Sequence, residues 1–152
     1  RIEQMGAPEA LYDLPRTAFV ADFLGQSNVF RGQATTANGS AIDVVIPGAT
    51  LRVPTARAAA HSGEVSVGVR PEKMSIHAGK VEASATRNVI SGGRVFDVNF
   101  TGVSSQYSVD FGALGIDKYN CVDHGFLSPV KFELNGTNLQ LLMAVNSFQH
   151  IN

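Results

Sequence analysis

The hydrophobic residues of the chain follow a helical spacing near the N-terminus. Residues 8–14 (PEALYDL) are mostly helix formers, with Pro8 suited to the first helical turn and Pro15 unable to continue the helix. In residues 17–24 (TAFVADFL), the apolar positions Phe19, Val20, Phe23 and Leu24 lie on one helical face, and Gly25 is a natural C-cap. The pattern therefore predicts two short helices joined at Pro15.

After Gly25 the apolar period changes to two, which is typical of β-strands. We expect strands at residues 42–46, 51–53, 65–69, 74–76, 96–100, 107–111, 130–134 and 139–143. Asn135-Gly136 is a strong hairpin signal, and residues 56–63 are typical of a loop or a short helix. Because the alternation is mostly one-sided, it favours an antiparallel sheet with one wet face, in a small barrel or sandwich.

The stretch VISGGRVF, residues 89–96, contains Ile90-Ser91-Gly92-Gly93-Arg94, which is similar to the Leu-Ser-Gly-Gly-Gln signature of ABC ATPases. That signature needs a helix behind its glycines, because the free amides of a helix start bind phosphate. Here β-branched and aromatic residues in strand alternation follow, and the chain has no GxxxxGK[ST] phosphate loop. We therefore interpret Ser91-Gly92-Gly93 as a glycine turn that enters a strand.

Composition narrows the classes of function. Apolar residues make up 44% of the 152 residues and charged residues 16%, with a net charge of -1, which is globular and lacks the dense basic stripe of a nucleic-acid binder. The single cysteine, Cys121, cannot form an internal disulfide or a CxxC site, and four scattered histidines do not indicate zinc. No GxSxG elbow is present, and Asp123-His124 is better explained as loop polarity than as a catalytic pair. We expect no catalytic, cofactor or metal residues.

Longer motifs resemble one family. Residues 1–15 and 19–32 are similar to the end of the nucleotide-binding domain in importer-type ABC ATPases. Residues 67–72 (VGVRPE) and 93–102 (GRVFDVNFTG) are similar to motifs of the C-terminal TOBE region in that family. The resemblance implies a mainly β fold: residues 1–25 are a helical tail of an absent nucleotide-binding domain, and residues 26–152 form two interleaved, antiparallel OB-like lobes. It weakens after residue 112, and residues 115–129 lack the family's usual approach to its last strands.

The resemblance also implies a function. Such lobes regulate and dimerise the ATP-binding subunit of an importer, and residues 25–28 (GQSN) are similar to those of the spermidine/putrescine group. A sugar or ferric-iron importer is the alternative within the family. The implied partners are a second copy of the subunit, its own nucleotide-binding domain and transmembrane permease subunits, with no nucleic acid. The parent would use ATP and Mg, whereas this chain would hold neither, and it would lie in the cytoplasm on the inner face of the membrane.

Five residues of the family motifs are candidates for the motif or interface positions: Asn28, Arg70, Pro71, Glu72 and Gly102. Read without the family, residues 70–72 form a corner between strands, where Glu72 pairs with Arg70 or with a neighbouring lobe.

A second hypothesis is ligand sensing. Residues 84–88 (SATRN) are similar to the SARN stretch of small molybdate-binding lobes, so Ser84, Thr86, Arg87 and Asn88 are candidates for binding an oxyanion such as molybdate or sulfate. The chain starts at Arg-Ile-Glu-Gln without a methionine, and we expect a piece of a longer protein. We also expect self-association, and an apolar face of residues 17–24 that packs on the absent domain or on the chain's own β lobe.

Overall fold

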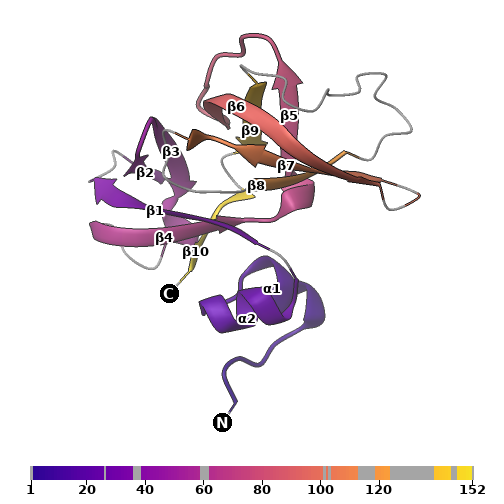
Figure 1. Ribbon diagram of the computed structural model, residues 1–152. Coiled ribbons are helices and arrows are strands. Elements are labelled where there is room, and N and C mark those ends of the chain that lie inside the picture. The colour runs from indigo at the N-terminus through magenta and orange to yellow at the C-terminus, as the bar shows by residue number, and fades with distance from the viewer. Residues whose placement is uncertain are drawn as a thin grey trace.

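The computed structural model describes residues 2–25, 27–35, 39–58, 62–100, 102, 104–112, 119–123, 139–144 and 147–151 (Figure 1). Both predicted helices are present, as α1 (Pro8–Asp13) and α2 (Ala18–Phe23). Pro8 lies in the first turn of α1. Before α2, the Thr17 hydroxyl accepts a hydrogen bond from the Val20 amide at 3.2 Å, which is the usual N-cap contact.

The first sheet has the strand order β10-β4-β1-β2-β3, and each neighbouring pair is antiparallel. Its strands are β1 (Asn28–Thr35), β2 (Ala41–Ile46), β3 (Ala49–Pro54), β4 (Gly63–Val69) and β10 (Gln149–Ile151). A short 3-10 helix, η1 (Thr55–Arg57), follows β3. β10 follows all the strands of the second sheet along the chain, so the first sheet contains strands from both ends of the β region.

The second sheet has the order β5-β9-β6-β7-β8 and is also antiparallel. It consists of β5 (Met74–Ala78), β6 (Arg87–Phe100), β7 (Ser105–Asp110), β8 (Tyr119–Asp123) and β9 (Leu139–Ala144). The 3-10 helix η2 (Pro71–Lys73) connects β4 to β5 and thus the two sheets. The predicted fold class, mainly antiparallel β behind a short helical segment, is confirmed.

One cluster of buried side chains fills the space between the sheets. The predicted inward faces of three strands are confirmed, since the following residues are all buried: Ile42, Val44, Ile46, Val65, Val67, Val69, Tyr107, Val109 and Phe111. Phe30 of β1 and Phe148, just before β10, pack with ring centroids 6.1 Å apart. The two ends of the β region therefore meet in the same core.

The glycines of residues 91–93 do not form a turn that enters a strand, which corrects the interpretation from the sequence. They lie inside the 14-residue strand β6, where the register against β9 shifts between Ser91 and Gly93. Gly92 has φ +86°, as a glycine at a β-bulge can. A Cβ on Gly93 would lie 2.7 Å from the Phe111 ring, so this position needs a glycine for close packing. The bulge keeps one strand continuous where the sequence indicated a break.

The predicted inward face of residues 96–100 is wrong. Val95 is buried, whereas Phe100 is 71% exposed. A second register shift in β6, between Val95 and Asp97, changes the phase of the alternation. In Figure 1 the β6–β7 hairpin extends away from the rest of the sheet, so its far end has little core to face.

The sequence pattern missed strands β1, β8 and β10 and the first part of β6. Short polar residues interrupt the alternation in β1, β8 and β6, and β10 has only three residues, too few to show a period. Asp123 belongs to β8, although the prediction placed it in a loop. The predicted strand at 130–134, the hairpin at 135–136 and His124 lie outside the described residues.

Candidate functional site

Arg70 stands where the first sheet passes into the second. It follows the last residue of β4, and Pro71 then starts η2, because proline has no N–H to continue the ladder. The Lys73 amide donates to the Arg70 carbonyl at 3.0 Å and closes this turn. The turn directs the side chains of Arg70, Glu72 and Lys73 toward the N-terminal helices.

The Arg70 side chain binds the backbone of the helical segment. It is only 2% exposed. Its Nη1 donates to the Gly25 carbonyl at 2.9 Å and its Nη2 to the Tyr12 carbonyl at 3.2 Å. The guanidinium also lies over the Tyr12 ring, 4.3 Å from the ring centroid, in a cation–π contact. A planar, forked cation can make these three contacts at once, and a lysine cannot.

Glu72 and Lys73 bind side chains of α1. The Tyr12 hydroxyl donates a short hydrogen bond to Glu72 Oε1, and Lys73 Nζ lies 3.1 Å from Asp13 Oδ1. Because ionised Tyr12 could no longer donate, the bond to Glu72 raises the pKa of Tyr12, with burial and the Glu72 charge acting in the same direction. Of the two partners expected from the sequence for Glu72, the structure shows neither a contact with Arg70 nor one between lobes. Glu72 instead accepts its hydrogen bond from Tyr12 of the helical segment.

We call Arg70, Glu72 and Lys73, together with Tyr12, Asp13 and Gly25, the clamp. Sequence reasoning identified Arg70 and Glu72 through the family motif, and Pro71, which is buried, as the residue that ends the strand. It missed the other four, since partners 45 to 60 positions apart leave no periodic signal.

Of the two remaining motif residues, Asn28 lies beside the strands that flank Arg70, whereas Gly102 lies in the β6–β7 connection. Asn28 is buried at the start of β1, opposite Val69, and its Nδ2 lies 2.7 Å from Met74 Sδ at the start of β5. It therefore fixes the strands on both sides of Arg70. Gly102 lies in the β6–β7 connection with φ +91°, in the hairpin that extends to the right in Figure 1.

The four oxyanion candidates are not brought together in one site. Ser84 and Arg87 close a two-residue turn through reciprocal backbone hydrogen bonds of 2.9 and 3.3 Å. Ser84, Thr86 and Arg87 are exposed on this turn, and Arg87 donates to the Glu82 carbonyl at 3.2 Å.

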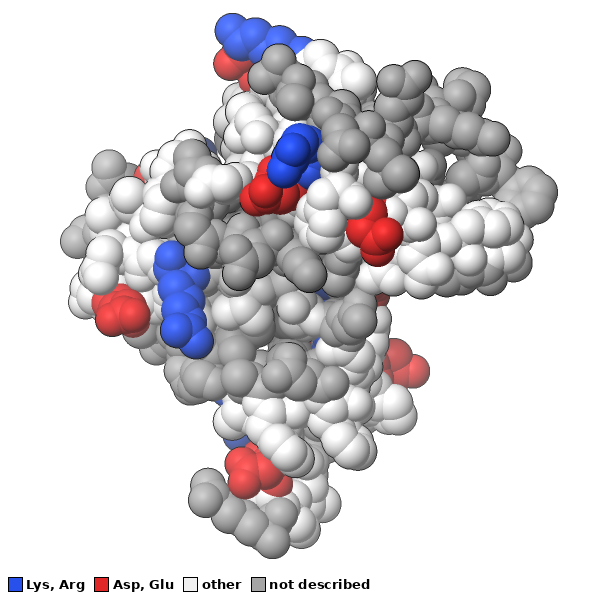
Figure 2. Space-filling model, viewed as in Figure 1, with Lys and Arg blue, Asp and Glu red and all other residues white. Residues whose placement is uncertain are grey.

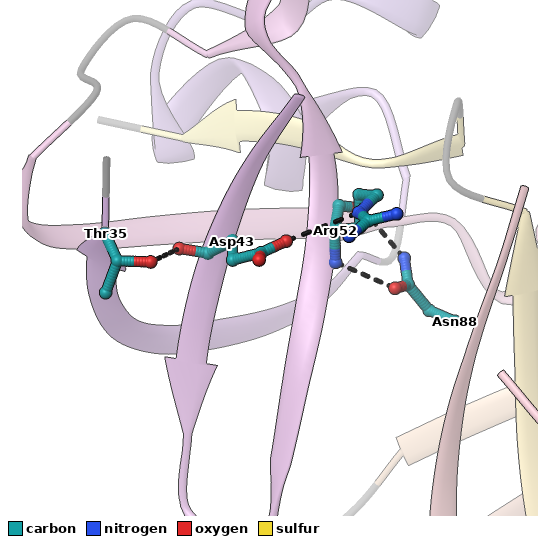
Figure 3. A network of polar contacts seen from close by, with 4 residues as sticks. All are labelled: Thr35, Asp43, Arg52 and Asn88. Atoms are coloured by element: carbon teal, nitrogen blue, oxygen red, sulfur yellow. Dashed lines mark hydrogen bonds and ion pairs between the residues drawn. The ribbon is translucent and has the colours of Figure 1, made fainter. Parts of the chain in front are cut away.

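Asn88, in contrast, is turned inward and joins the two sheets (Figure 3). It is 3% exposed, its Oδ1 accepts from the Arg52 amide at 2.7 Å, and its Nδ2 donates to the Arg52 carbonyl at 2.9 Å. The carboxamide thus occupies the position of a neighbouring strand on the edge of β3. Arg52 in turn pairs with Asp43 at 3.4 Å, and the Thr35 hydroxyl donates to the Asp43 carbonyl at 3.2 Å.

Among the described residues, charge is not concentrated on the face seen in Figure 2. In Figure 2 basic and acidic residues lie in small separate groups among uncharged ones. Within the described part of the chain, no three metal-ligating side chains come together, and no helix is long and apolar enough to cross a membrane.

Comparisons with known proteins show which family and which proteins this chain is similar to. Residues 67–120, which include η2 and the bulge, match the TOBE domain family. The spermidine/putrescine import ATP-binding protein PotA of Trichormus variabilis is 34% identical over 113 residues, covering 72% of this chain and 29% of that protein. The Fe(3+) ions import ATP-binding protein FbpC of Vibrio cholerae is 38% identical over 88 residues, covering 55% of this chain and 23% of that protein.

A third relative, the sn-glycerol-3-phosphate import ATP-binding protein UgpC of a Jannaschia species, is 42% identical over 73 residues, covering 47% of this chain and 19% of that protein. Among solved structures, the cytoplasmic molybdate-binding protein ModG has a TM-score of 0.60 at 14% identity, covering 82% of this chain and 96% of that one. At that identity the likeness shows the fold alone. The chain spans about three tenths of the length of the first PotA relatives.

Proposed function

We propose that this chain regulates and dimerises the ATP-binding subunit of an ABC importer and has no ATP site of its own. The chain belongs to the TOBE-containing C-terminal region of such subunits. The family assignment rests on the TOBE match and the importer relatives. The regulatory role rests on the clamp, which is the observation that carries the proposal.

The clamp supports this role because it connects two structurally different parts of the chain. In the proposal, residues 1–25 are the tail of the ATP-binding domain and residues 26–152 are the regulatory region. Arg70, Glu72 and Lys73 hold that tail through contacts to Gly25, Tyr12 and Asp13. Any displacement of the ATP-binding domain would pull on α1 and α2. Because these contacts are partly buried and charge-assisted, they would pass the displacement to the β lobes.

The proposal separates this chain from the catalytic half of the parent. ATP and Mg would be bound by the part that precedes it, since the sequence here contains no phosphate loop. Isothermal titration of Mg-ATP into the chain should show no saturable heat. Binding with a micromolar Kd would contradict the absence of an ATP site.

For the solute we favour a polyamine, because several relatives are spermidine/putrescine import proteins. The parent subunit would then work with permease subunits on the cytoplasmic face of the membrane. Uptake of labelled putrescine, ferric iron and glycerol 3-phosphate by cells with and without the parent gene distinguishes the candidates. A gene deletion that impairs only ferric-iron or glycerol 3-phosphate uptake would exclude the polyamine assignment.

Dimerisation is tested on the parent subunit with its β region intact. Sedimentation of the nucleotide-free subunit should show a dimer, and removal of residues 26–152 should give a monomer that still binds ATP. A truncated subunit that remains dimeric without nucleotide would show that the β lobes do not hold the pair together.

A further inference from the structure

A depression of about 350 Å³ lies on the second sheet, at the bulge of β6. Its walls come from the end of β5 and the following turn, from β6 at the bulge, and from the start of β9. The lining includes Gly79, Lys80, Ser91, Gly92, Leu139 and Gln140. None of these residues belongs to the clamp or to the Ser84–Arg87 turn.

The depression is open because two glycines border it. Gly79 and Gly92 both have positive φ, +111° and +86°, and a Cβ built on either would meet nothing within 4 Å. The ladder between β6 and β9 pairs Ser91 with Gln140 and Gly93 with Leu139, and so passes over Gly92. Because the extra residue at a bulge has no partner residue of its own and the ladder is locally disrupted, the Gly92 backbone N–H is a candidate donor to a ligand.

The floor carries an ordered set of polar groups. Gln140 is only 8% exposed, and its Oε1 accepts from the Val81 amide. Its Nε2 donates to Ser91 Oγ at 3.1 Å. Since Ser91 Oγ is the acceptor in that bond, its own proton is left to be donated to a ligand, and the Gln140 carboxamide carries a second N–H.

The rim carries a cation and the wall is apolar. Lys80 Nζ lies 3.0 Å from Glu82 Oε1, and both side chains are at least 80% exposed, so solvent screens the pair and the ammonium can turn to another anion. Leu139, which is buried, and Ala78 supply apolar surface. Hydroxyl, amide and ammonium donors beside an apolar wall suit an anion that carries a short hydrocarbon chain.

We propose that this depression binds a small organic carboxylate, with Ser91, Gly92 and Lys80 donating to its oxygens and Leu139 contacting its hydrocarbon part. A volume of about 350 Å³ lies at the lower end of the range for small-molecule sites, and an inorganic oxyanion would leave most of it empty. The site is independent of the proposed scaffold role, because it requires neither the clamp nor a second copy of the chain.

The test is an NMR titration of the full chain with acetate, butyrate and hexanoate, at constant ionic strength set by chloride. Butyrate should shift the amides of Gly79, Ser91 and Gly92 saturably, and its Kd should be lower than that of acetate by about fourfold for each added methylene that is buried. Inorganic phosphate and molybdate should give no saturable shift at these amides.

The variants separate the site from a general salt effect. Ser91→Ala should weaken butyrate binding by about tenfold and Lys80→Gln by about three- to tenfold, since each removes one donor. Arg87→Gln, at the exposed turn, is the matched control and should leave the Kd unchanged. The proposal is overturned by shifts centred on residues 84–88, by tighter binding of phosphate than of butyrate, or by a butyrate Kd that neither Ser91→Ala nor Lys80→Gln changes.

Discussion

Replacement of Arg70 by lysine tests the clamp most directly. Lysine keeps the positive charge, but its ammonium is a point donor that cannot reach the carbonyls of Gly25 and Tyr12 together, nor stack on the Tyr12 ring. Arg70→Lys therefore removes one of the two carbonyl contacts and the cation–π contact, and leaves the fold of the two sheets intact. The change should loosen the attachment of α1.

The magnitude follows from the contacts that are lost. A hydrogen bond with a charged donor contributes about 1.5–3 kcal/mol, and a partly desolvated cation–π contact about 0.5–2 kcal/mol. Allowing for the contact that lysine retains, we expect docking of α1 to weaken by about 2–4 kcal/mol, which is about 30- to 700-fold in the docking equilibrium.

Amide hydrogen exchange reads this equilibrium out locally. α1 has six residues, far fewer than an isolated helix needs in water, so its amides are protected only while the helix is docked. The Leu11 and Leu14 amides, bonded to Ala7 and Ala10 at 2.9 and 3.0 Å, should exchange about 30- to 700-fold faster in Arg70→Lys, up to the rate of a free peptide.

Amides of β4 should keep their protection, because that strand is paired on both sides. Arg94→Lys is the matched control, since Arg94 is half-exposed and its nearest carboxylate oxygen, on Asp110, is 3.7 Å away. It should change exchange at α1 by less than twofold. Unchanged exchange at Leu11 and Leu14 in Arg70→Lys would refute the claim that Arg70 holds the helix.

Three further changes test the parts of the fold that position the clamp and the sheets. Asn88→Ala should lower the free energy of unfolding in urea by about 1–3 kcal/mol, because it removes two hydrogen bonds between the sheets. Gly93→Ala should lower it by about 1–3 kcal/mol, because the new Cβ would lie 2.7 Å from the Phe111 ring. In an alkaline absorbance titration, Tyr12 should ionise above its ordinary pKa of 10.0, and Glu72→Gln should lower that pKa. Since the pKa is raised by folding, the Tyr12 contact stabilises fully below pH 10 and is lost as the pH rises through the folded value.

A control variant or a contradicting result can be stated for each of these three predictions. Thr86→Ala, on the exposed turn beside Asn88, should stay within about 0.5 kcal/mol of the parent chain, and an equal loss in both variants would remove the special role of Asn88. Gly92→Ala meets open space but a positive φ, so it should cost only about 1–2 kcal/mol of strain, and a larger loss than in Gly93→Ala would contradict the packing at Phe111. A Tyr12 that titrates at or below its ordinary pKa would contradict its bond to Glu72.

Much of the local structure could be predicted from the sequence, because its cause is local. Pro8 and Pro15 restrict the backbone wherever the chain folds, and Gly25 admits the positive φ, +140°, that follows the second helix. These three residues correctly delimited two short helices. Alternation of apolar and polar residues likewise predicted the inward faces of β2, β4 and β7, because a strand with one buried face has a period of two. The family motifs identified Arg70 and Glu72 as residues to examine, without their partners.

Only the tertiary structure decided the rest, because it depends on residues that are distant in sequence. Gly93 requires its glycine because of the Phe111 ring, and the bulges of β6 arise from its register against β9 and β7. Asn88 reaches a backbone 36 positions away, and Arg70 reaches carbonyls 45 and 58 positions away. Periodicity describes which face of an element is buried, but it carries no information on which buried groups meet. The sequence thus determined both helices, most of the strands and the family, whereas the contacts between residues 70–73 and the helical segment, which form the clamp, were decided by the tertiary structure.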